Sequence, residues 1–500
     1  MDNTAEALWR HAQAAPDSVA LRDDAGVSWT YGTLRDRAGA LAASLREAGI
    51  GPGDRVLLVA PAVPEFAVAY YGIHAAGAIA VTANTMSTAH ELHYVGQDAG
   101  VALVLGWIQI GPAPAETAAR LNVPYWPMTT GMPDLAARTG PDDPHPTGGD
   151  DTAVILYTSG TTGRPKGAQL THGNLNACAA MIRRAHEVTA ADHCLSALPL
   201  FHVYGQACVL NTVIHTGASL SLLPRFTPEG MLALLARDKP TFMAGVPTMW
   251  NALLRAAGGH RPADFAGLRH AVSGGASLPG EVMYAFQEHF GCAVLEGYGL
   301  TETTGAGTAH VTGRPRRPGT VGAALPGCEI TVRDTDGAEL PDGEVGEIHI
   351  SGPVVMKGYW NRPDATAEVL RDGRLRTGDL GARDADGDLR IVGRKKELVI
   401  RGGYNVYPTE VEEVLYQHPD IVEAAVIGVP DDHYGEEVAA AIAVRDGAEL
   451  TGDDLRRWAK QRLSAYKVPH LITIVDQLPK GPTGKILKRA ISPALFEGRR

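Results

Sequence analysis

The sequence has few cysteines, and their arrangement argues against a disulfide framework. The 500 residues contain five cysteines, an odd number, and no two of them form a Cys-x-x-Cys pair. They sit in apolar or mixed stretches, which favours buried free thiols in a reducing compartment. These residues are Cys178, Cys194, Cys208, Cys292 and Cys328.

Positive charge and long apolar runs are also scarce. Lys and Arg number 45 against 56 Asp and Glu, a net charge of −11, which argues against nucleic acid or an acidic membrane as the main partner. The most apolar region, residues 56–83, is interrupted by Pro61, Pro64, Glu65 and His74 and falls short of the ~20 apolar residues that a membrane helix needs. The start of the chain lacks the basic and apolar segments of a signal peptide. We therefore expect a cytoplasmic protein without integral membrane contact.

The sequence contains alternating helix and strand patterns over most of its length. The chain is about three times as long as a ~150-residue domain, which predicts more than one compact unit. Segments with helical spacing alternate with short apolar runs, as in layered α/β domains. The loop 138–151 is rich in Pro, Gly and Asp and could end a subdomain. The pattern predicts helices at 29–48 and 65–76 and strands at 56–60, 78–81, 153–157, 219–223, 241–245, 270–273 and 293–295.

The pattern changes after about residue 330. Asp-Gly pairs punctuate short strands there, which predicts a small antiparallel β unit. We expect an α/β protein with a large N-terminal domain of layered α/β subdomains plus this small β unit (1–393), a hinge (394–396), and a small mobile α+β C-terminal domain (397–500). The elements predicted in this half are strands at 329–333, 346–351, 389–392, 424–429 and 471–474 and helices at 408–418 and 451–463.

The sharpest motif is residues 157–167, Tyr-Thr-Ser-Gly-Thr-Thr-Gly-Arg-Pro-Lys-Gly, directly after an apolar strand. Its glycines let backbone N–H groups face phosphate oxygens, its hydroxyls add donors, and Lys166 adds a positive charge. A Walker loop is excluded because Lys166 is followed by Gly167 and not by Ser or Thr. A lone Gly/Ser/Thr run is most often a surface loop. So long and specific a run after a strand nevertheless predicts a polyphosphate site.

This motif resembles the phosphate loop of the adenylate-forming superfamily, which contains acyl-CoA synthetases, luciferases and peptide-synthetase adenylation domains. Five further segments match that family in the same order, so the resemblance spans essentially the whole chain. It implies a ligase in which a carboxylic acid and MgATP give acyl-AMP and pyrophosphate, after which the thiol of coenzyme A displaces AMP. The matching segments are 273–278 (Ser-Gly-Gly-Ala-Ser-Leu), 297–303 (Gly-Tyr-Gly-Leu-Thr-Glu-Thr), 377–379 (Thr-Gly-Asp), 393–403 and 479–485.

The resemblance also implies the nucleotide site. The ring of Tyr298 between two glycines suits stacking on adenine, Asp379 would accept bonds from the ribose hydroxyls, and Arg394 would reach the ribose and phosphates. The residues implied to bind ATP or AMP are Thr158, Ser159, Gly160, Thr161, Thr162, Gly163, Lys166, Gly274, Gly275, Ala276, Gly297, Tyr298, Gly299, Asp379 and Arg394.

Four residues are implied to act in catalysis. Thr301 would bond the α-phosphate, and Glu302 would bind Mg²⁺, a hard cation that takes carboxylate and phosphate oxygens. Lys485 would contact the substrate carboxylate and the α-phosphate and stabilise charge that develops between them. His202 lies in a segment, residues 201–205, whose family counterpart gates or lines the acid site. A histidine in an apolar stretch is as often a core residue, and this alternative stays open.

The acyl pocket is implied to consist of small and apolar residues, which favours a medium- or long-chain fatty acid. No acidic residue occurs in 199–208, which disfavours an amino-acid substrate, because amino-acid-activating relatives keep an aspartate there. An aryl acid and a malonate-type acid are alternatives, and the latter needs a buried cation. The implied pocket residues are His202, Val203, Tyr204, Val246, Gly275 and Gly299, and the candidate cations are Arg225, Arg255, Arg314, Arg316 and Arg317.

The acceptor is inferred from the C-terminal motifs. Lys396 matches the family's hinge position, and Gly402 and Gly403 would let a pantetheine arm pass close to the backbone. Coenzyme A is the expected acceptor, with an acyl carrier protein as the alternative, and the enzyme is expected to be a monomer or homodimer. Two rival classes are a nucleotide-binding regulatory protein, which acid-dependent pyrophosphate release would exclude, and a P-loop hydrolase or kinase, which would release ADP instead of AMP.

Overall fold

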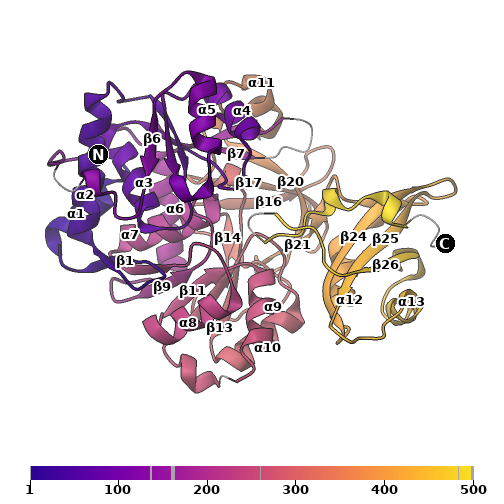
Figure 1. The fold of residues 1–500 in the computed structure, drawn as a ribbon. Helices are drawn as coiled ribbons and strands as arrows, with labels where there is room; N and C mark the ends of the chain where they lie inside the picture. Colours follow the sequence, from indigo (N-terminus) through magenta and orange to yellow (C-terminus); the bar gives the residue numbers. More distant parts are fainter. Residues whose placement is uncertain (1, 136–137, 159–163, 260, 482–483, 497–500) are drawn as a thin grey trace.

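The computed structural model describes residues 2–135, 138–158, 164–259, 261–481 and 484–496 (Figure 1). They form a large N-terminal domain and a small C-terminal domain of the expected α/β class (Figure 1). Every cysteine is a free thiol, and only Cys328 is not fully buried. Within the described ranges, no helix combines the length and the apolar character needed to cross a membrane.

The first sheet of the large domain carries the stem of the phosphate loop. Its strand order is β18-β8-β7-β4-β3-β5-β6. The strands from β6 to β7 run parallel, and β8 and β18 are antiparallel additions. The strands are β3 (Arg55–Val59), β4 (Ile79–Thr82), β5 (Leu103–Trp107), β6 (Tyr125–Met128), β7 (Thr152–Thr158), β8 (Lys166–Thr171) and β18 (Gly358–Tyr359).

The expectation that the loop 138–151 ends a subdomain is wrong. β7 follows this loop and pairs with β4 inside the same sheet. A Pro- and Gly-rich loop shows where the chain turns, but it carries no information on which sheet the next strand joins. The buried apolar run of β7 suits a strand covered on both faces, as in parallel sheets.

The second sheet leads into two of the other motifs. Its strand order is β15-β14-β13-β12-β11-β9-β10-β1-β2, with parallel pairing from β1 to β13. The chain continues from the carboxyl ends of β12 and β13 into the segments 273–278 and 297–303, at the edge where α/β sheets bind ligands. The strands are β1 (Val19–Arg22), β2 (Ser28–Thr30), β9 (His193–Ser196), β10 (Ser219–Leu222), β11 (Phe242–Gly245), β12 (His270–Ser273), β13 (Ala293–Tyr298), β14 (Thr308–Ala309) and β15 (Ala323–Ala324).

The most apolar part of the chain forms a central helix. Every residue of α3 (Pro64–Ala76) is buried, and α3 packs against α2 (Tyr31–Glu47), whose N-terminus is capped by the Thr30 side chain. An all-round apolar helix is typical of the core of a large domain. The other helices of the large domain are α1 (Glu6–Ala14), α4 (Ala89–Ala99), α5 (Ala113–Leu121), α6 (His172–Ala185), α7 (Thr212–Thr216), α8 (Pro228–Asp238), α9 (Pro247–Ala256), α10 (Gly280–Phe290) and α11 (Pro363–Val369).

The small antiparallel β unit is present as predicted. The glycines of its four Asp-Gly turns all adopt left-handed φ angles, which glycine tolerates best. β20 pairs with β17 on one side and β21 on the other. The strands are β16 (Glu329–Arg333), β17 (Gly346–Ser351), β19 (Leu370–Arg371), β20 (Arg374–Arg383) and β21 (Leu389–Arg394).

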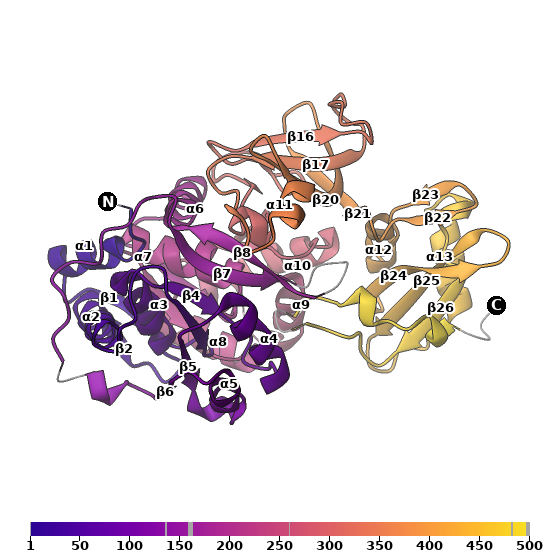
Figure 2. The ribbon, with the colours of Figure 1, turned by 90° about the horizontal axis from the view of Figure 1, so that it is seen from above.

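In the small C-terminal domain the sequence predicted two of the strands that the described residues form and missed three, of which the longest follows the 421–431 strand. This strand, β25 (Gly435–Val444), is alanine-rich, and alanine has a low strand propensity, so its pairing with β24 decides its conformation. The domain lies beside α9 of the large domain in both views (Figures 1 and 2). Its other elements are β22 (Val399–Arg401), β23 (Tyr404–Val406), α12 (Pro408–Tyr416), β24 (Ile421–Asp431), α13 (Gly452–Lys460) and β26 (Leu471–Val475).

Candidate active site

The stem of the phosphate loop is a β hairpin. Thr158 at the end of β7 faces Lys166 at the start of β8 in the antiparallel register. Tyr94 of α4 donates a hydrogen bond from its hydroxyl to the Pro165 carbonyl at 2.8 Å, which fixes the stem against α4. The other predicted loop residues, Ser159, Gly160, Thr161, Thr162 and Gly163, lie outside the described residues.

Glu302 meets this stem. It lies in the short turn Thr301–Thr303 and accepts a hydrogen bond at Oε1 from the Tyr359 hydroxyl at 2.8 Å, while Thr158 Oγ1 lies 3.5 Å from the same oxygen. Burial and the Glu302 charge raise the pKa of Tyr359, so the phenol keeps its proton and continues to donate. The Lys166 ammonium lies 5.3 Å from the centre of the Tyr359 ring. The structure thus brings together the predicted residues Thr158, Lys166 and Glu302.

The oxygen groups here fit Mg²⁺ that arrives with ATP. Glu302 offers one carboxylate and Thr158 one hydroxyl, both hard donors of the kind that Mg²⁺ takes together with phosphate oxygens and water. Across the part of the chain that the structure describes, no group of three or more His, Cys, Asp and Glu side chains could hold a metal ion by itself. The site therefore suits a metal shared with the nucleotide.

A second cluster surrounds Asp379. Tyr298 donates its hydroxyl hydrogen to Asp379 Oδ2 at 2.6 Å, and Arg394 Nε lies 3.1 Å from Oδ1. Burial raises the pKa of Asp379, although the positive charge of Arg394 opposes this shift. Asp379 lies inside β20, opposite Arg394 of β21, and not in a simple turn. The structure therefore joins the residues predicted for the adenine and the ribose.

Lys485 reaches this cluster from the small domain. Its neighbour Gly484 accepts a hydrogen bond from Thr248 Oγ1 of α9 at 3.1 Å. The Lys485 side chain is exposed to solvent, yet the protein atoms around it partly desolvate the ammonium. This desolvation and the positive charge of Arg394 lower the pKa of Lys485, while Asp379 opposes the shift. A cation with a lowered pKa beside an anion site is typical of a functional group.

His202, the residue predicted to order the acid, lies close enough to Lys485 to be affected by its charge. Its Nδ1 accepts a hydrogen bond from the Tyr204 backbone N–H at 3.2 Å, so the neutral ring carries its proton on Nε2. Burial and the nearby positive charge of Lys485 lower the pKa of His202 to about 4. The imidazole is therefore neutral near pH 7, and Nε2–H can donate to a carboxylate.

The residues predicted for the acyl pocket pack against the glycine motifs. A Cβ atom at Gly274 would lie 3.1 Å from the Tyr204 ring, and one at Gly275 would lie 3.6 Å from Val246. Gly275 also has a φ of +81°, and Ala276 beside it is exposed. Glycine at these positions therefore keeps space between the strand ends.

The glycines of the segment 297–303 are close-packed against the residues that follow. A Cβ atom at Gly299 would lie 2.4 Å from the backbone of Gly305 and Ala306, so no side chain fits there. A Cβ atom at Gly297 would lie 3.2 Å from the Thr308 carbonyl oxygen, a tighter contact than most Cβ atoms make. Val203 is buried next to Gly305.

The predicted hinge lies where the large domain ends, and the predicted thiol channel lies in the small domain. Lys396 follows Lys395, whose ammonium pairs with Glu347 of β17 at 3.1 Å. Gly402 and Gly403 form an exposed turn between β22 and β23 with φ angles of +56° and +85°. The structure brings Lys485 to the Asp379 cluster, whereas the hydrogen bond of the glycine turn, from Gly402 N–H to Tyr434 O, is internal to the small domain.

Sequence reasoning missed Tyr359 and Thr248. Tyr359 lies in the two-residue strand β18, far along the chain from β8 with which it pairs. The aromatic pair Tyr359 and Trp360 after a glycine was the available signal, but it belongs to none of the six motifs. Thr248 contributes one hydroxyl at the start of α9 and carries no local signature.

Comparisons with known proteins identify the family of the chain. Residues 8–360 match the family model of the AMP-binding enzyme, and residues 410–485 match that of the AMP-binding enzyme C-terminal domain. The chain belongs to the AMP-binding enzyme family. The resemblance stated from the motifs is therefore confirmed.

Relatives of this AMP-binding enzyme cover nearly its whole length. Feruloyl-CoA synthase of an Amycolatopsis species is 38% identical over 484 residues, 96% of both chains. Long-chain-fatty-acid–CoA ligase of Bacillus subtilis is 36% identical over 95% of this chain and 91% of its own. The crystal structure of ATP-bound MatB from Rhodopseudomonas palustris superposes with a TM-score of 0.92 at 34% identity, covering 99% of this chain and all of that one.

Proposed function

We propose that this AMP-binding enzyme activates a medium- or long-chain fatty acid and transfers it to coenzyme A. The enzyme is an ATP-dependent, AMP-forming acyl-CoA ligase. A carboxylate oxygen attacks the α-phosphorus of ATP, which forms acyl-AMP and releases pyrophosphate. The thiol sulfur of CoA then attacks the acyl carbonyl carbon, which forms the thioester and releases AMP. The family match and the relatives named as CoA ligases support this reaction.

One observation carries the proposal: groups from both domains converge on one site. Asp379, with Tyr298 and Arg394, would hold the ribose and phosphates. Lys485 would lie between the attacking carboxylate and the α-phosphate, where a fixed cation stabilises developing negative charge. Mg²⁺ bound through Glu302 would neutralise charge on the triphosphate.

The remaining site residues have roles in the same step. Thr301 would bond the α-phosphate, and His202 would orient the carboxylate through Nε2–H. Thr158 and Lys166, at the two ends of the phosphate loop, would contact the outer phosphates.

The second half-reaction requires a different arrangement of the small domain. We assign the large domain to residues 1–393, the hinge to 394–396 and the mobile domain to 397–500. Rotation about Lys396 would withdraw Lys485 and bring the turn Gly402–Gly403 to the acyl-adenylate, where it would line the path of the CoA thiol.

The class of the carboxylic acid substrate is inferred from the positions of the candidate arginines. All five arginines considered for a second carboxylate, at positions 225, 255, 314, 316 and 317, are exposed. Arg317 pairs with Asp384 and Asp386, and Arg314 lies 3.7 Å from Asp388. None of these five arginines would offer a dicarboxylate a buried partner, which disfavours a malonate-type acid. An aryl acid is the second candidate, favoured by the identity to feruloyl-CoA synthase.

A product-resolved screen tests both candidates. ATP, CoA and one acid at a time (octanoate, palmitate, 4-coumarate or malonate) are incubated with the enzyme, and AMP, ADP, pyrophosphate and thioester are quantified. We expect AMP and thioester, with the highest kcat/KM for octanoate or palmitate. Preference for 4-coumarate would select the aryl acid, preference for malonate would overturn the fatty-acid assignment, and ADP would overturn the reaction. An acyl carrier protein in place of CoA tests the alternative acceptor.

We also propose a cytoplasmic location. All five cysteines are free thiols, as expected in a reducing compartment.

A further inference from the structure

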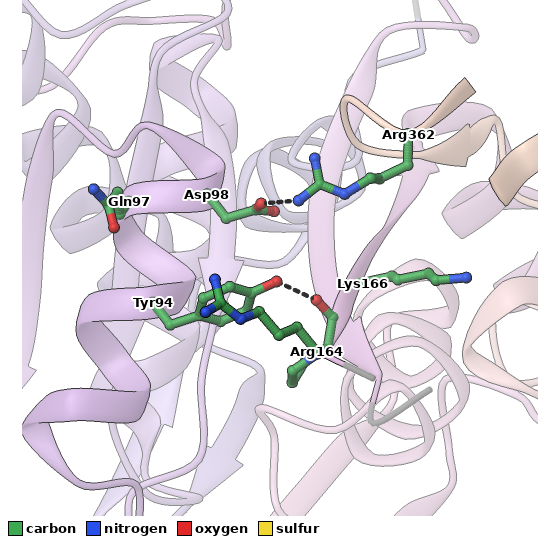
Figure 3. A pocket seen from close by; sticks show the side chains of 7 residues that line it. Tyr94, Gln97, Asp98, Arg164, Lys166 and Arg362 are labelled. Atoms are coloured by element: carbon green, nitrogen blue, oxygen red, sulfur yellow. Dashed lines mark hydrogen bonds and ion pairs between the residues drawn. The ribbon is translucent and has the colours of Figure 1, made fainter. Parts of the chain in front are cut away.

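A cavity of about 430 Å³ lies beside the stem of the phosphate loop (Figure 3). Its walls come from α4, the start of β8 and the residue Arg362 beyond β18. The Lys166 side chain points away from Arg164 and Arg362 (Figure 3), and its ammonium lies over the Tyr359 ring. The lining residues are Tyr94, Gln97, Asp98, Arg164, Pro165, Lys166 and Arg362.

One face of α4 holds two arginines at this cavity. Tyr94 and Asp98 are four residues apart and therefore lie on the same face of the helix. The Arg164 guanidinium lies over the Tyr94 ring, 5.7 Å from its centre, and Arg362 forms an ion pair with Asp98 Oδ1 at 2.5 Å. The two guanidinium groups are thus oriented before any ligand arrives.

The two guanidinium groups at the cavity have N–H donors available for an anion. Both oxygens of Asp98 are occupied, Oδ1 by Arg362 and Oδ2 by the Tyr157 hydroxyl at 2.7 Å. Two guanidinium groups therefore face one carboxylate that is already bonded. Arg164 has no ion pair among the described residues, and each guanidinium carries five N–H donors in a fork that matches phosphate oxygens. The Arg362 side chain is 44% exposed, so a solute can reach it.

We infer that this cavity is a second anion site, which binds a phosphate group outside the adenylation site. Two ligands of the proposed reaction carry such a group, pyrophosphate from the first half-reaction and coenzyme A for the second, so the choice of ligand rests on the proposed function. Both present phosphate oxygens to Arg164 and Arg362. The cavity adjoins Pro165 and Lys166, at the end of the loop that would hold the outer phosphates of ATP.

Calorimetry with two probes tests the site directly. Inorganic pyrophosphate and adenosine 3′,5′-bisphosphate, which represents the nucleotide end of CoA, are titrated separately at fixed ionic strength. Saturating α,β-methylene-ATP blocks the adenylation site, and no acid is present. We expect at least one probe to bind. Binding that occurs only without the ATP analogue would overturn the proposal, because the probe would then occupy the adenylation site.

Two variants of one ion pair should change this binding in opposite directions. Arg362→Gln removes a cation and should weaken the bound probe about tenfold, the usual size of one charge-assisted hydrogen bond. Asp98→Asn removes the competing anion while its amide oxygen still accepts from Tyr157, and it should tighten binding severalfold. Arg120→Ala, an exposed arginine on α5, is the matched control and should change nothing.

The results distinguish the two possible ligands and separate a binding site from an ion pair that only supports the fold. Weakening of pyrophosphate or of the bisphosphate in Arg362→Gln identifies that ligand, and either result supports the site. Equal loss in Arg362→Gln and Asp98→Asn would show that the ion pair only supports the fold and would overturn the site. No change in either variant would overturn it too. Acid-dependent pyrophosphate release by the wild type tests the proposed function separately, since the calorimetry needs no turnover.

Discussion

The two halves of the site are held in different ways. In the large domain, Glu302 and Asp379 are fixed by tyrosine hydroxyls at 2.8 and 2.6 Å, within one body of packed strands. The small domain contributes Lys485 and meets α9 through single hydrogen bonds such as that from Asn251 to the Val422 carbonyl at 2.9 Å (Figure 2). The half proposed to bind the nucleotide is thus held by more contacts than the proposed catalytic cation. The proposed mechanism needs this difference, because AMP would stay bound in two half-reactions while the group facing the acid changes.

We expect the largest effect from a substitution at Lys485, the residue that the small domain contributes to the site. Lys485→Ala should reduce acid-dependent pyrophosphate release about 10²–10³-fold, because a transition-state charge loses its partner. Thioester formation from preformed acyl-AMP should keep the wild-type rate. Lys480→Ala is the control, since Lys480 pairs with Glu423 within the small domain. Full pyrophosphate release by Lys485→Ala would remove Lys485 from the mechanism.

A substitution at Glu302, in the large domain, should change how the adenylation rate depends on Mg²⁺. Glu302→Gln should lower the adenylation rate about 10²-fold and raise the Mg²⁺ concentration needed for half-maximal rate, because a carboxylate ligand of a hard cation is lost. Tyr359→Phe removes only the hydrogen bond to that carboxylate and should cost less than tenfold. Rates measured against Mg²⁺ at saturating ATP check both variants. An unchanged Mg²⁺ dependence in Glu302→Gln would contradict the metal assignment.

A substitution at the proposed hinge should affect the second half-reaction more than the first. Lys396→Pro fixes φ and should slow thioester formation about tenfold while it leaves adenylation nearly intact. Single-turnover assays of each step give the two rates. Lys396→Ala, which keeps backbone freedom, is the control. Equal loss in both steps would contradict rotation at Lys396.

A smaller effect is expected at the contact between the halves. Thr248→Val removes the hydrogen bond to the Gly484 carbonyl, worth about 1 kcal/mol, and should slow adenylation about fivefold without affecting thioester formation. Thr248→Ser keeps the hydroxyl and should restore the rate. A variant that slows both steps alike would indicate damage to α9 instead.

The pH profile gives the smallest signal. The pKa of Lys485 is lowered by desolvation and by Arg394, so the ammonium is present below that pKa and is lost as the pH rises through it. Adenylation should therefore decline on the alkaline side before an ordinary lysine, of pKa about 10.4, would titrate. Lys485→Arg should move this decline to higher pH, because arginine stays protonated. Initial rates between pH 7 and about 10.5 measure the shift.

The sequence predicted those parts of the site whose chemistry is local. A run of glycines and hydroxyl side chains, or an aspartate after Thr-Gly, indicates the kind of ligand group it suits, and this can be inferred without knowledge of the fold. The bond from Tyr359 to Glu302 could not be predicted, since it depends on β18 pairing with β8 across almost two hundred residues. The same limit applies to β25, whose alanines form a strand because β24 and β26 pair with it on its two sides.

Asp379 and Arg394 lie opposite each other on β20 and β21, and Arg394 is two residues before Lys396. In the proposed mechanism, a ribose that bonds to the Asp379 carboxylate would compete for the oxygens that Arg394 uses. Nucleotide binding would then weaken a contact on the last strand of the large domain, two residues before the proposed pivot. The stiffness of the proposed hinge would thus depend on whether the nucleotide is bound.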